Sequence, residues 1–277
     1  MNIKIVADSS SDILDIGYES FKSAPLKIIT DKKEFVDDAN LDIKEMVDFL
    51  GGYKGKSSTS CPNQNDWLEC FGEAERIFCV TITSTLSGSY NSAMLAKQVY
   101  EEKHPERKVF ILDSLSTGAE MALIIEKFKE IILSGTSFED ACTQVAEYSK
   151  KTGLIFMLES MRNLANNGRV SPIVAKMAGL LGIRVVGKAS AVGDLEPLSK
   201  CRGEAKAFQT ITEVLKKEGV KSGKIKITHC FNETAAKALQ SIIKKEIPNA
   251  ETKIYSTRGL CSFYAEKGGM IIGFEKQ

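Results

Sequence analysis

Two clusters of hydroxyl side chains are the most prominent polar features of the sequence. Residues 57–62 (Ser-Ser-Thr-Ser-Cys-Pro) directly precede a predicted helix, and residues 83–89 (Thr-Ser-Thr-Leu-Ser-Gly-Ser) join a predicted buried strand to the next helix. Open α/β folds bind ligands at such strand ends. Helix-initial N–H groups suit an anion, and Ser and Thr hydroxyls add neutral donors. We therefore predict that the two clusters hold a carboxylate, although helix capping alone would also explain either one.

Few side chains in the chain could catalyse a reaction. Its two histidines are His104, at the predicted end of a helix, and His229, at the predicted end of a strand. No HExxH, CxxC or GxSxG pattern is present, and these are spacings that metal sites, redox sites and serine hydrolases use. Residues 51–57 resemble a phosphate-binding loop, but they follow a predicted helix instead of a strand, which argues against a nucleotide site. A hydrolase or a small-molecule kinase would have to pair Ser87 with His229 at about 3 Å.

The composition is that of an ordinary globular protein, with 43% hydrophobic and 26% charged residues. The 37 basic and 36 acidic side chains give a formal net charge of +1, which argues against nucleic-acid binding because nucleic-acid-binding domains are strongly basic. The seven cysteines form no CxxC pair, as expected for reduced thiols in the cytosol. We find no leader-like N-terminal pattern and no apolar run of about 18 residues, so we expect a cytoplasmic protein without an integral membrane segment.

An alternation of strands and helices must position the hydroxyl clusters. Short apolar runs that end in turn residues predict strands at 3–6, 26–29, 77–82, 109–112 and 154–158. Apolar spacing and capping residues predict helices at 41–50, 63–74, 87–102, 118–133 and 138–149. This order is typical of βαβ units around a parallel sheet.

After about residue 159 the pattern changes. Short helices are predicted at 161–165 and 172–181, followed by a hairpin of strands at 183–188 and 196–200. Helices at 204–218 and 233–245 then alternate with strands at 225–229 and 253–256, the last strand that we predict. The fold class is therefore α/β, with a parallel-sheet N-terminal domain, 1–158, and a mixed α/β C-terminal domain, 159–277.

Several motifs, taken in order, resemble the DegV family. Residues 6–12 (VADSSSD) resemble the family's opening strand and Asp-Ser-Thr/Ser turn, and residues 59–62 (TSCP) its Thr-Ser-Gln-Pro loop, with Cys in place of Gln. Residues 82–93 (ITSTLSGSYNSA) resemble its Ser-Ser-Gly-Leu-Ser-Gly-Thr-Tyr run, and residues 164–171 (LANNGRVS) its Leu-x-x-Gly-Gly-Arg-Ile-Ser segment. Segments at 113–118, 193–203 and 229–236 follow the family's order, so the resemblance spans nearly the whole chain.

The resemblance implies a two-domain DegV-type fold that holds one long-chain fatty acid in a tunnel between the domains. A protein of this type is not an enzyme and carries no metal or other cofactor. It presents the carboxylate of the fatty acid to a separate fatty acid kinase, which makes an acyl phosphate for phospholipid synthesis. By motif, Thr59 and Ser87 contact the carboxylate and Arg202 docks the kinase. Arg169 is a second basic candidate near the ligand or the domain interface, unless it only ties down the turn after Asn167.

Apolar side chains around the predicted domain boundary would form the tunnel walls, although most of them suit a core equally well. The candidates are Phe156, Leu158, Met161, Leu164, Ile173, Met177, Leu180 and Leu181. Flexible Met side chains would suit acyl chains of different length.

One family motif is missing. The family has His-Thr-Gly-x-Gly near its C-terminus, where the His helps to bind the carboxylate, whereas residues 254–260 read Ile-Tyr-Ser-Thr-Arg-Gly-Leu. We expect Ser256 or Thr257 to replace this His, or Arg258 to pair with the anion. The alternatives to the kinase-linked function are a stand-alone lipid sensor or buffer, and a hydrolase or kinase-like enzyme that uses Ser87 and His229.

Overall fold

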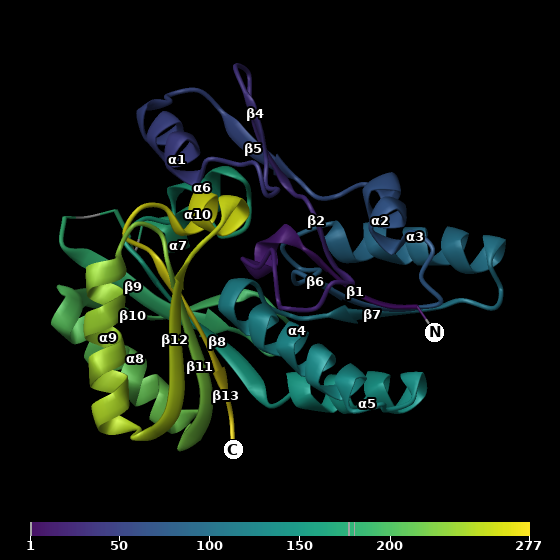
Figure 1. Ribbon diagram of the computed structural model, residues 1–277. Helices are drawn as coiled ribbons and strands as arrows, with labels where there is room; N and C mark the ends of the chain where they lie inside the picture. Colours follow the sequence, from purple (N-terminus) through teal and green to yellow (C-terminus); the bar gives the residue numbers. More distant parts are fainter. Residues whose placement is uncertain (1, 177, 180) are drawn as a thin grey trace.

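The computed structural model describes residues 2–176, 178–179 and 181–277, and Figure 1 shows its sheets with helices between and around them. The first sheet has four parallel strands in the order β2-β1-β6-β7. Their bounds are β1 Ile3–Asp8, β2 Phe21–Ala24, β6 Arg76–Thr81 and β7 Lys108–Asp113. This finding confirms the predicted parallel sheet.

Helices cover both faces of the first sheet because its strands alternate between two cores. On β6, Ile77 and Cys79 pack in the core that α2 and α3 close, whereas Phe78 and Val80 pack in the core that α4 and α5 close. This period of two is that of a strand buried on both faces. The helix bounds are α2 Gln64–Phe71, α3 Ser89–Lys103, α4 Gly118–Leu133 and α5 Phe138–Ser149.

A small antiparallel sheet, in the order β4-β3-β5, lies beside the first one. It consists of β3 Lys27–Thr30, β4 Glu34–Val36 and β5 Ser57–Ser60, and α1 (Ile43–Gly52) connects β4 to β5. The first hydroxyl cluster was predicted as a loop before a helix, and this was wrong, because it pairs with β3 so that Thr59 lies opposite Ile28. Pairing with a distant strand overrides the weak local signal of a Ser-rich segment.

The third sheet has six strands in the order β10-β9-β8-β13-β11-β12, and only β11 and β12 are parallel. The predicted mixed α/β character of this part of the chain and the predicted hairpin of β9 and β10 are confirmed. On the outer face, α8 (Glu204–Lys217) and α9 (Glu233–Glu246) close a core with alternate strand residues (Figure 1). The strand bounds are β8 Thr152–Leu158, β9 Ile183–Ala189, β10 Leu195–Arg202, β11 Ser222–His229, β12 Asn249–Ser256 and β13 Met270–Glu275.

Several elements differ from the sequence predictions. The last strand is β13 and not β12, and it lies between β8 and β11 in the middle of the sheet. A short helix, α10 (Gly259–Ala265), precedes it, and a 3-10 turn at Ser9–Ser11 follows β1. The predicted helix at 161–165 is α6 (Arg162–Asn166), whereas the helix predicted at 172–181 is only α7 (Pro172–Ala175).

The two predicted domains exchange elements. β8 ends at residue 158, inside the predicted first domain, but its hydrogen-bonded neighbours are β9 and β13 of the second. In return, α10 packs with α1 and β3, where Phe263 shares a core with Ile28, Phe35 and Met46. We therefore propose that the boundary in the chain lies between α5 and β8, and that α10 belongs to the N-terminal body by its packing.

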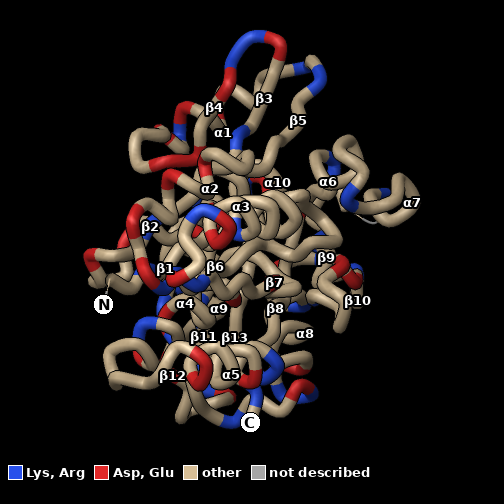
Figure 2. Tube along the Cα trace, turned by 90° about the vertical axis from the view of Figure 1, so that its right-hand side faces the viewer, with Lys and Arg blue, Asp and Glu red and all other residues tan. Residues whose placement is uncertain are grey.

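Acidic and basic residues lie side by side along the outer segments of the trace, whose middle is largely uncharged (Figure 2). Within the described ranges, no helix combines the length and the apolar composition that crossing a bilayer would require.

Candidate ligand-binding site

A cavity of about 260 Å³ lies between the six-stranded sheet and the loops of the first two sheets. Its floor is formed by strand residues that alternate with the outer core, namely Leu154, Phe156, Leu158, Leu195 and Ile271. Its apolar roof is formed by Leu26, Ile82, Leu86 and Leu260, with Leu164 and Ala265 at the side. The polar lining comes from Thr59, Ser60, Cys61, Ser87, Thr117, Arg169, Cys261 and Tyr264. The cavity is thus apolar along the sheet, and its polar groups come from the segments that cover the sheet.

The two hydroxyl clusters of the sequence meet in this cavity. Thr59 comes from β5 and Ser87 from the loop before α3, and both line the wall. The hydroxyl of Thr59 shares a hydrogen bond of 2.7 Å with the hydroxyl of Tyr264. The Ser87 hydroxyl accepts from the backbone N–H of Ser89 at 3.2 Å, so its own proton is free to be donated into the cavity.

Asp8 holds the loop that carries Ser87. This carboxylate is fully buried at the end of β1, and it accepts hydrogen bonds from the backbone N–H of Ile82 (2.8 Å) and the hydroxyl of Ser89 (2.6 Å). Burial raises the pKa of Asp8, and the hydrogen bonds from Ser10, Ser89 and Ile82 oppose that rise. The turn after β1 therefore fixes where α3 begins, and with it the position of Ser87.

Arg169 contributes a cation to the cavity wall. Its Nε donates to the carbonyl of Leu86 at 3.1 Å, and another guanidinium nitrogen donates to the carbonyl of Asn167. No carboxylate of the described residues forms an ion pair with this guanidinium. Arg169 therefore ties down the turn after α6 through these hydrogen bonds. It also brings to the cavity a positive charge that has no acidic partner among the described residues.

Tyr264 is a lining residue that the sequence analysis missed. Burial raises the pKa of its hydroxyl, while the hydrogen bond with Thr59 and the charge of Arg169 oppose the rise. The hydroxyl is therefore protonated at neutral pH and available as a donor. No local signal identifies it, because the helix α10 that carries it has only seven residues.

Buried carboxylates of the N-terminal half hold α10 in place. Asp37 accepts from the backbone N–H groups of Gly259 (2.9 Å) and Leu260 (2.8 Å), and Asp12 accepts from that of Arg258 (2.6 Å). Burial raises the pKa of Asp37, and burial raises the pKa of Asp12 to about 8. These bonds satisfy helix-initial donors that would otherwise be buried without partners.

The residues expected to replace the missing His lie outside the cavity. Ser256 is exposed at the end of β12, and Thr257 is buried with its hydroxyl bonded to Ser262 at 2.7 Å. The Arg258 side chain donates to the carbonyl of Asp38 and approaches Asp37 to 3.8 Å. The chain turns into α10 shortly after β12, and Tyr264, further along, brings a hydroxyl group to the cavity wall.

The residues predicted to form the tunnel walls divide into four groups. Phe156, Leu158 and Leu164 line the cavity. Met161 is buried in the adjacent core without lining it, whereas Ile173 is 80% exposed and Leu181 is also exposed. Met177 and Leu180 lie outside the described residues. Helix α7 ends at Ala175, so it contributes no residue to the cavity lining.

The remaining candidates lie away from the hydroxyl cluster. Arg202 is exposed at the end of β10. His229 is buried at the end of β11, where its Nδ1 accepts from the backbone N–H of Asn232 at 3.2 Å, and burial lowers its pKa. It does not line the cavity that Ser87 lines, so the nucleophile–base contact that a hydrolase needs is not formed between these described residues.

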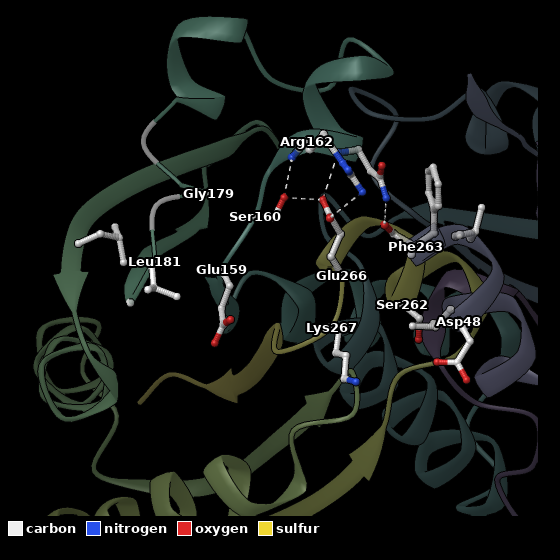
Figure 3. Close-up of a pocket in the computed structure, with 16 residues that line it drawn as sticks. Asp48, Glu159, Ser160, Arg162, Gly179, Leu181, Ser262, Phe263, Glu266 and Lys267 are labelled. Atoms are coloured by element: carbon white, nitrogen blue, oxygen red, sulfur yellow. Dashed lines mark hydrogen bonds and ion pairs between the residues drawn. The ribbon is translucent and has the colours of Figure 1, made fainter. Parts of the chain in front are cut away.

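A second, larger hollow of about 800 Å³ lies on the other side of α10 (Figure 3). In it, Glu266 accepts from the Ser160 hydroxyl at 2.8 Å and lies 3.7 Å from the Arg162 guanidinium. Phe263 and Glu266 face this hollow, whereas Tyr264 and Ala265 line the apolar cavity. Helix α10 is thus a wall shared by the two spaces. Within the described ranges, no group of His, Cys, Asp and Glu side chains is arranged to hold a metal ion.

The fold and sequence match proteins whose structures contain fatty acids. A DegV family protein from Eubacterium eligens, loaded with heptadecanoic acid, has a TM-score of 0.97 and 44% identity, with 99% of this chain and 100% of that chain covered. The fatty acid kinase (Fak) B3 protein of Streptococcus pneumoniae, loaded with linoleic acid, has a TM-score of 0.98 and 43% identity, with both chains fully covered.

Sequence comparison gives the same relationship. A DegV domain-containing protein of Streptococcus pneumoniae is 43% identical over 279 residues, which is 99% of each chain. One from Streptococcus gordonii is 39% identical over the same share of both chains. The model of the DegV family, described as "Uncharacterised protein, DegV family", matches residues 2–277. The chain belongs to the DegV family.

Proposed function

We propose that this protein binds one long-chain fatty acid in a tunnel between its N-terminal and C-terminal halves, and presents the carboxylate to a partner fatty acid kinase. In this proposal the cavity between the six-stranded sheet and the hydroxyl clusters is the described part of the tunnel. The protein is then a binding subunit that catalyses no reaction itself.

The apolar floor and roof would supply most of the affinity. A chain of sixteen carbons has about fifteen CH₂ and CH₃ groups, and burial of each is worth about 0.8 kcal/mol, so the gross gain is on the order of 12 kcal/mol before the cost of association. The lining residues Leu154, Phe156, Leu158, Leu195 and Ile271 offer the matching surface along three strands.

The polar part of the wall would orient the fatty acid. Thr59 and Ser87 can donate hydroxyl protons to the two carboxylate oxygens, Tyr264 can donate to the Thr59 hydroxyl and so orient it, and Arg169 can balance the charge. Hydrogen bonds to a charged group contribute about 1.5–3 kcal/mol each. The observation that carries the proposal is this meeting of hydroxyls and a cation without an acidic partner at one side of an otherwise apolar cavity.

The named relatives support both parts of the proposal. The Eubacterium eligens protein is loaded with heptadecanoic acid, and the Streptococcus pneumoniae protein is a fatty acid kinase B protein loaded with linoleic acid. By analogy, we propose a kinase as the partner of this chain and the exposed Arg202 as part of its docking surface.

Mass spectrometry of the purified protein tests the binding part. Organic extraction is expected to release about one equivalent of a long-chain fatty acid. A Thr59→Ala/Ser87→Ala double variant is expected to lose more than about tenfold in fatty acid affinity, because it removes two charge-assisted hydrogen bonds. The matched control is Ser58→Ala/Ser84→Ala, which changes neighbouring hydroxyls that do not line the cavity. An empty, stable parent protein, or equal affinity in the two double variants, would contradict the proposal.

Acyl-phosphate formation with a purified fatty acid kinase tests the partner. Arg202→Ala is expected to retain fatty acid as the parent does but to lower the rate of transfer. A rate equal to that of the parent would remove Arg202 from the docking surface. Lipid binding without any transfer, in the parent, would instead favour a stand-alone lipid sensor or buffer.

A further inference from the structure

The sheet face that forms the cavity floor contains, next to the lining residue Phe156, a position without a side chain. On the cavity face of β9, Val185 and Ala189 belong to the core around the cavity, and the residue between them on that face is Gly187. Gly187 pairs with Phe156 of β8 across the sheet. Because paired residues point to the same face, the missing side chain leaves space beside Phe156.

The ring of Phe156 fills this space. A Cβ atom placed on Gly187 would lie 2.7 Å from Cε2 of the ring and closer still to Cζ, which is nearer than real contacts allow. The ring therefore lies sideways over the glycine instead of standing up from the sheet. Phe156 is 2% exposed and still lines the cavity, midway between Leu154 and Leu158 on the same strand face.

We propose that Phe156, lying over Gly187, is a specificity-determining residue that limits the width of the acyl site at the middle of the bound chain. This inference rests on the proposed fatty acid binding. A straight chain passes beside the ring, whereas a chain bent by cis double bonds needs lateral room there. A smaller side chain at position 156 frees the space above Gly187 and favours bent chains.

The opposite face of the same sheet supplies a matched control. There, the ring of Phe274 on β13 lies over Gly153 on β8, and a Cβ on Gly153 would lie 2.5 Å from the Cζ atom of Phe274. Phe274 is 2% exposed, as Phe156 is, but it belongs to the outer core with α8 and α9. Truncation of either ring weakens the sheet in a similar way, and only truncation of Phe156 changes the cavity.

Competition between fatty acids of equal length tests the inference. The parent, Phe156→Leu and Phe274→Leu are each incubated with equal amounts of stearic, oleic and linoleic acid, repurified and extracted for mass spectrometry. We expect the ratio of linoleic to stearic acid to rise about fourfold or more in Phe156→Leu, the gain from burying one further CH₂ group. The ratio in Phe274→Leu is expected to equal that of the parent. Phe156→Met, with a slimmer and more flexible side chain, is the second variant if Phe156→Leu does not fold.

The other possible results of this experiment would contradict either the inference or the proposed function. An unchanged ratio in the Phe156 variants would overturn the inference, and so would an equal rise in Phe274→Leu, which would indicate general loosening of the sheet. Failure of the parent to retain any of the three acids would instead overturn the proposed function. Gly187→Ala is not the test, because its Cβ would also lie 2.6 Å from the backbone carbonyl of Glu196 and disturb the hairpin.

Discussion

The two faces of the six-stranded sheet are built from the same alternation of residues along its strands, but one face packs a core and the other borders the cavity. Along β11, Ile225 and Ile227 point to the outer core, while Lys226 and Thr228 are buried on the inner side, where Lys226 pairs with Glu126 of α4. The outer face meets two long amphipathic helices and packs against them with large apolar side chains. The inner face meets α4 over β13 and β11, and it also meets loops, hydroxyl side chains and the short helix α10, beside which a cavity remains.

The difference shows that the covering elements, more than the strands, decide where a ligand can bind. Along β8, Ile155 and Met157 face the outer core, and Leu154, Phe156 and Leu158 face the cavity, and both sets are large apolar side chains. Regular helices fill the space over a sheet because their apolar stripes match it. Irregular segments leave space and bring polar groups, so we expect the outer face to contribute most to stability and the inner face to hold the proposed ligand.

The largest effects are expected from truncating one buried leucine on each side of the sheet, which should separate stability from ligand retention. Leu239→Ala, at a fully buried position on α9, is expected to lower the free energy of unfolding by about 2–5 kcal/mol while leaving the bound fatty acid unchanged. Leu158→Ala, on the cavity floor, is expected to reduce fatty acid retention as well. Urea unfolding and mass spectrometry of the extract measure the two quantities. Equal loss of lipid in both variants would show that the faces are not functionally distinct.

A charge change on the inner face is expected to have the next largest effect. Arg169→Met removes the cation that lacks an acidic partner, and with it a charge-assisted interaction of about 1.5–3 kcal/mol, so fatty acid affinity should fall about tenfold or more. Arg169→Lys keeps the charge and should lose less. The affinity for the corresponding fatty alcohol is the control, since an uncharged head group should be nearly insensitive to either change.

Asp12, which is buried beside α10, should make the free energy of unfolding depend on pH. Its pKa is raised from 3.8 to about 8, mainly by burial beside α10. Between these values the folded protein holds a proton that the unfolded chain has lost, so this group makes the protein less stable as pH rises from about 4 to 8, by at most about 1.4 kcal/mol per pH unit. Asp12→Asn keeps an acceptor for the Arg258 N–H and should flatten this slope.

Chemical denaturation of parent and Asp12→Asn at several pH values checks the slope. The carboxylates of Asp8, Asp37 and Glu120 are also buried with raised pKa, so the parent-minus-variant difference is the informative quantity. A difference that does not change between pH 4 and 8 would contradict the role of Asp12. Leu239→Ala should shift the whole curve without altering its slope.

The smallest expected effect concerns Tyr264. Tyr264→Phe removes one hydroxyl, retains the edge-to-face packing on Phe263 at 4.8 Å between ring centroids, and leaves Thr59 without its partner. A loss of about 0.5–1.5 kcal/mol in fatty acid binding is expected, with little change in stability. Isothermal titration with a fatty acid measures it. A larger loss of stability than of affinity would make Tyr264 a structural residue of α10.

Much of the fold could be predicted because its signals are local. Three of the four strands of the first sheet, β1, β6 and β7, are apolar runs that were predicted, whereas β2 (FKSA) has no such signal and was missed. Asn63 before α2 forms a capping box with Asp66, which is a local signal for the start of a helix. The turn that follows Ile183–Ala189 predicted the hairpin with the next strand, since antiparallel neighbours need only a tight connection. The meeting of Thr59 and Ser87 was expected from the family resemblance, and the structure places both on one cavity wall.

The rest depended on contacts between distant segments. β13 enters the middle of the sheet between β8 and β11, and nothing in its own residues specifies that place. Ser256 was a reasonable substitute for the missing His by its position in the chain, but it is exposed, and Tyr264 lines the cavity instead. The sequence alone determined most of the strands and helices, the hydroxyl clusters and the family. The tertiary structure alone decided which side chains share the cavity, because Asp12 and Asp37, more than 200 residues away in the chain, hold the helix that brings Tyr264 to Thr59.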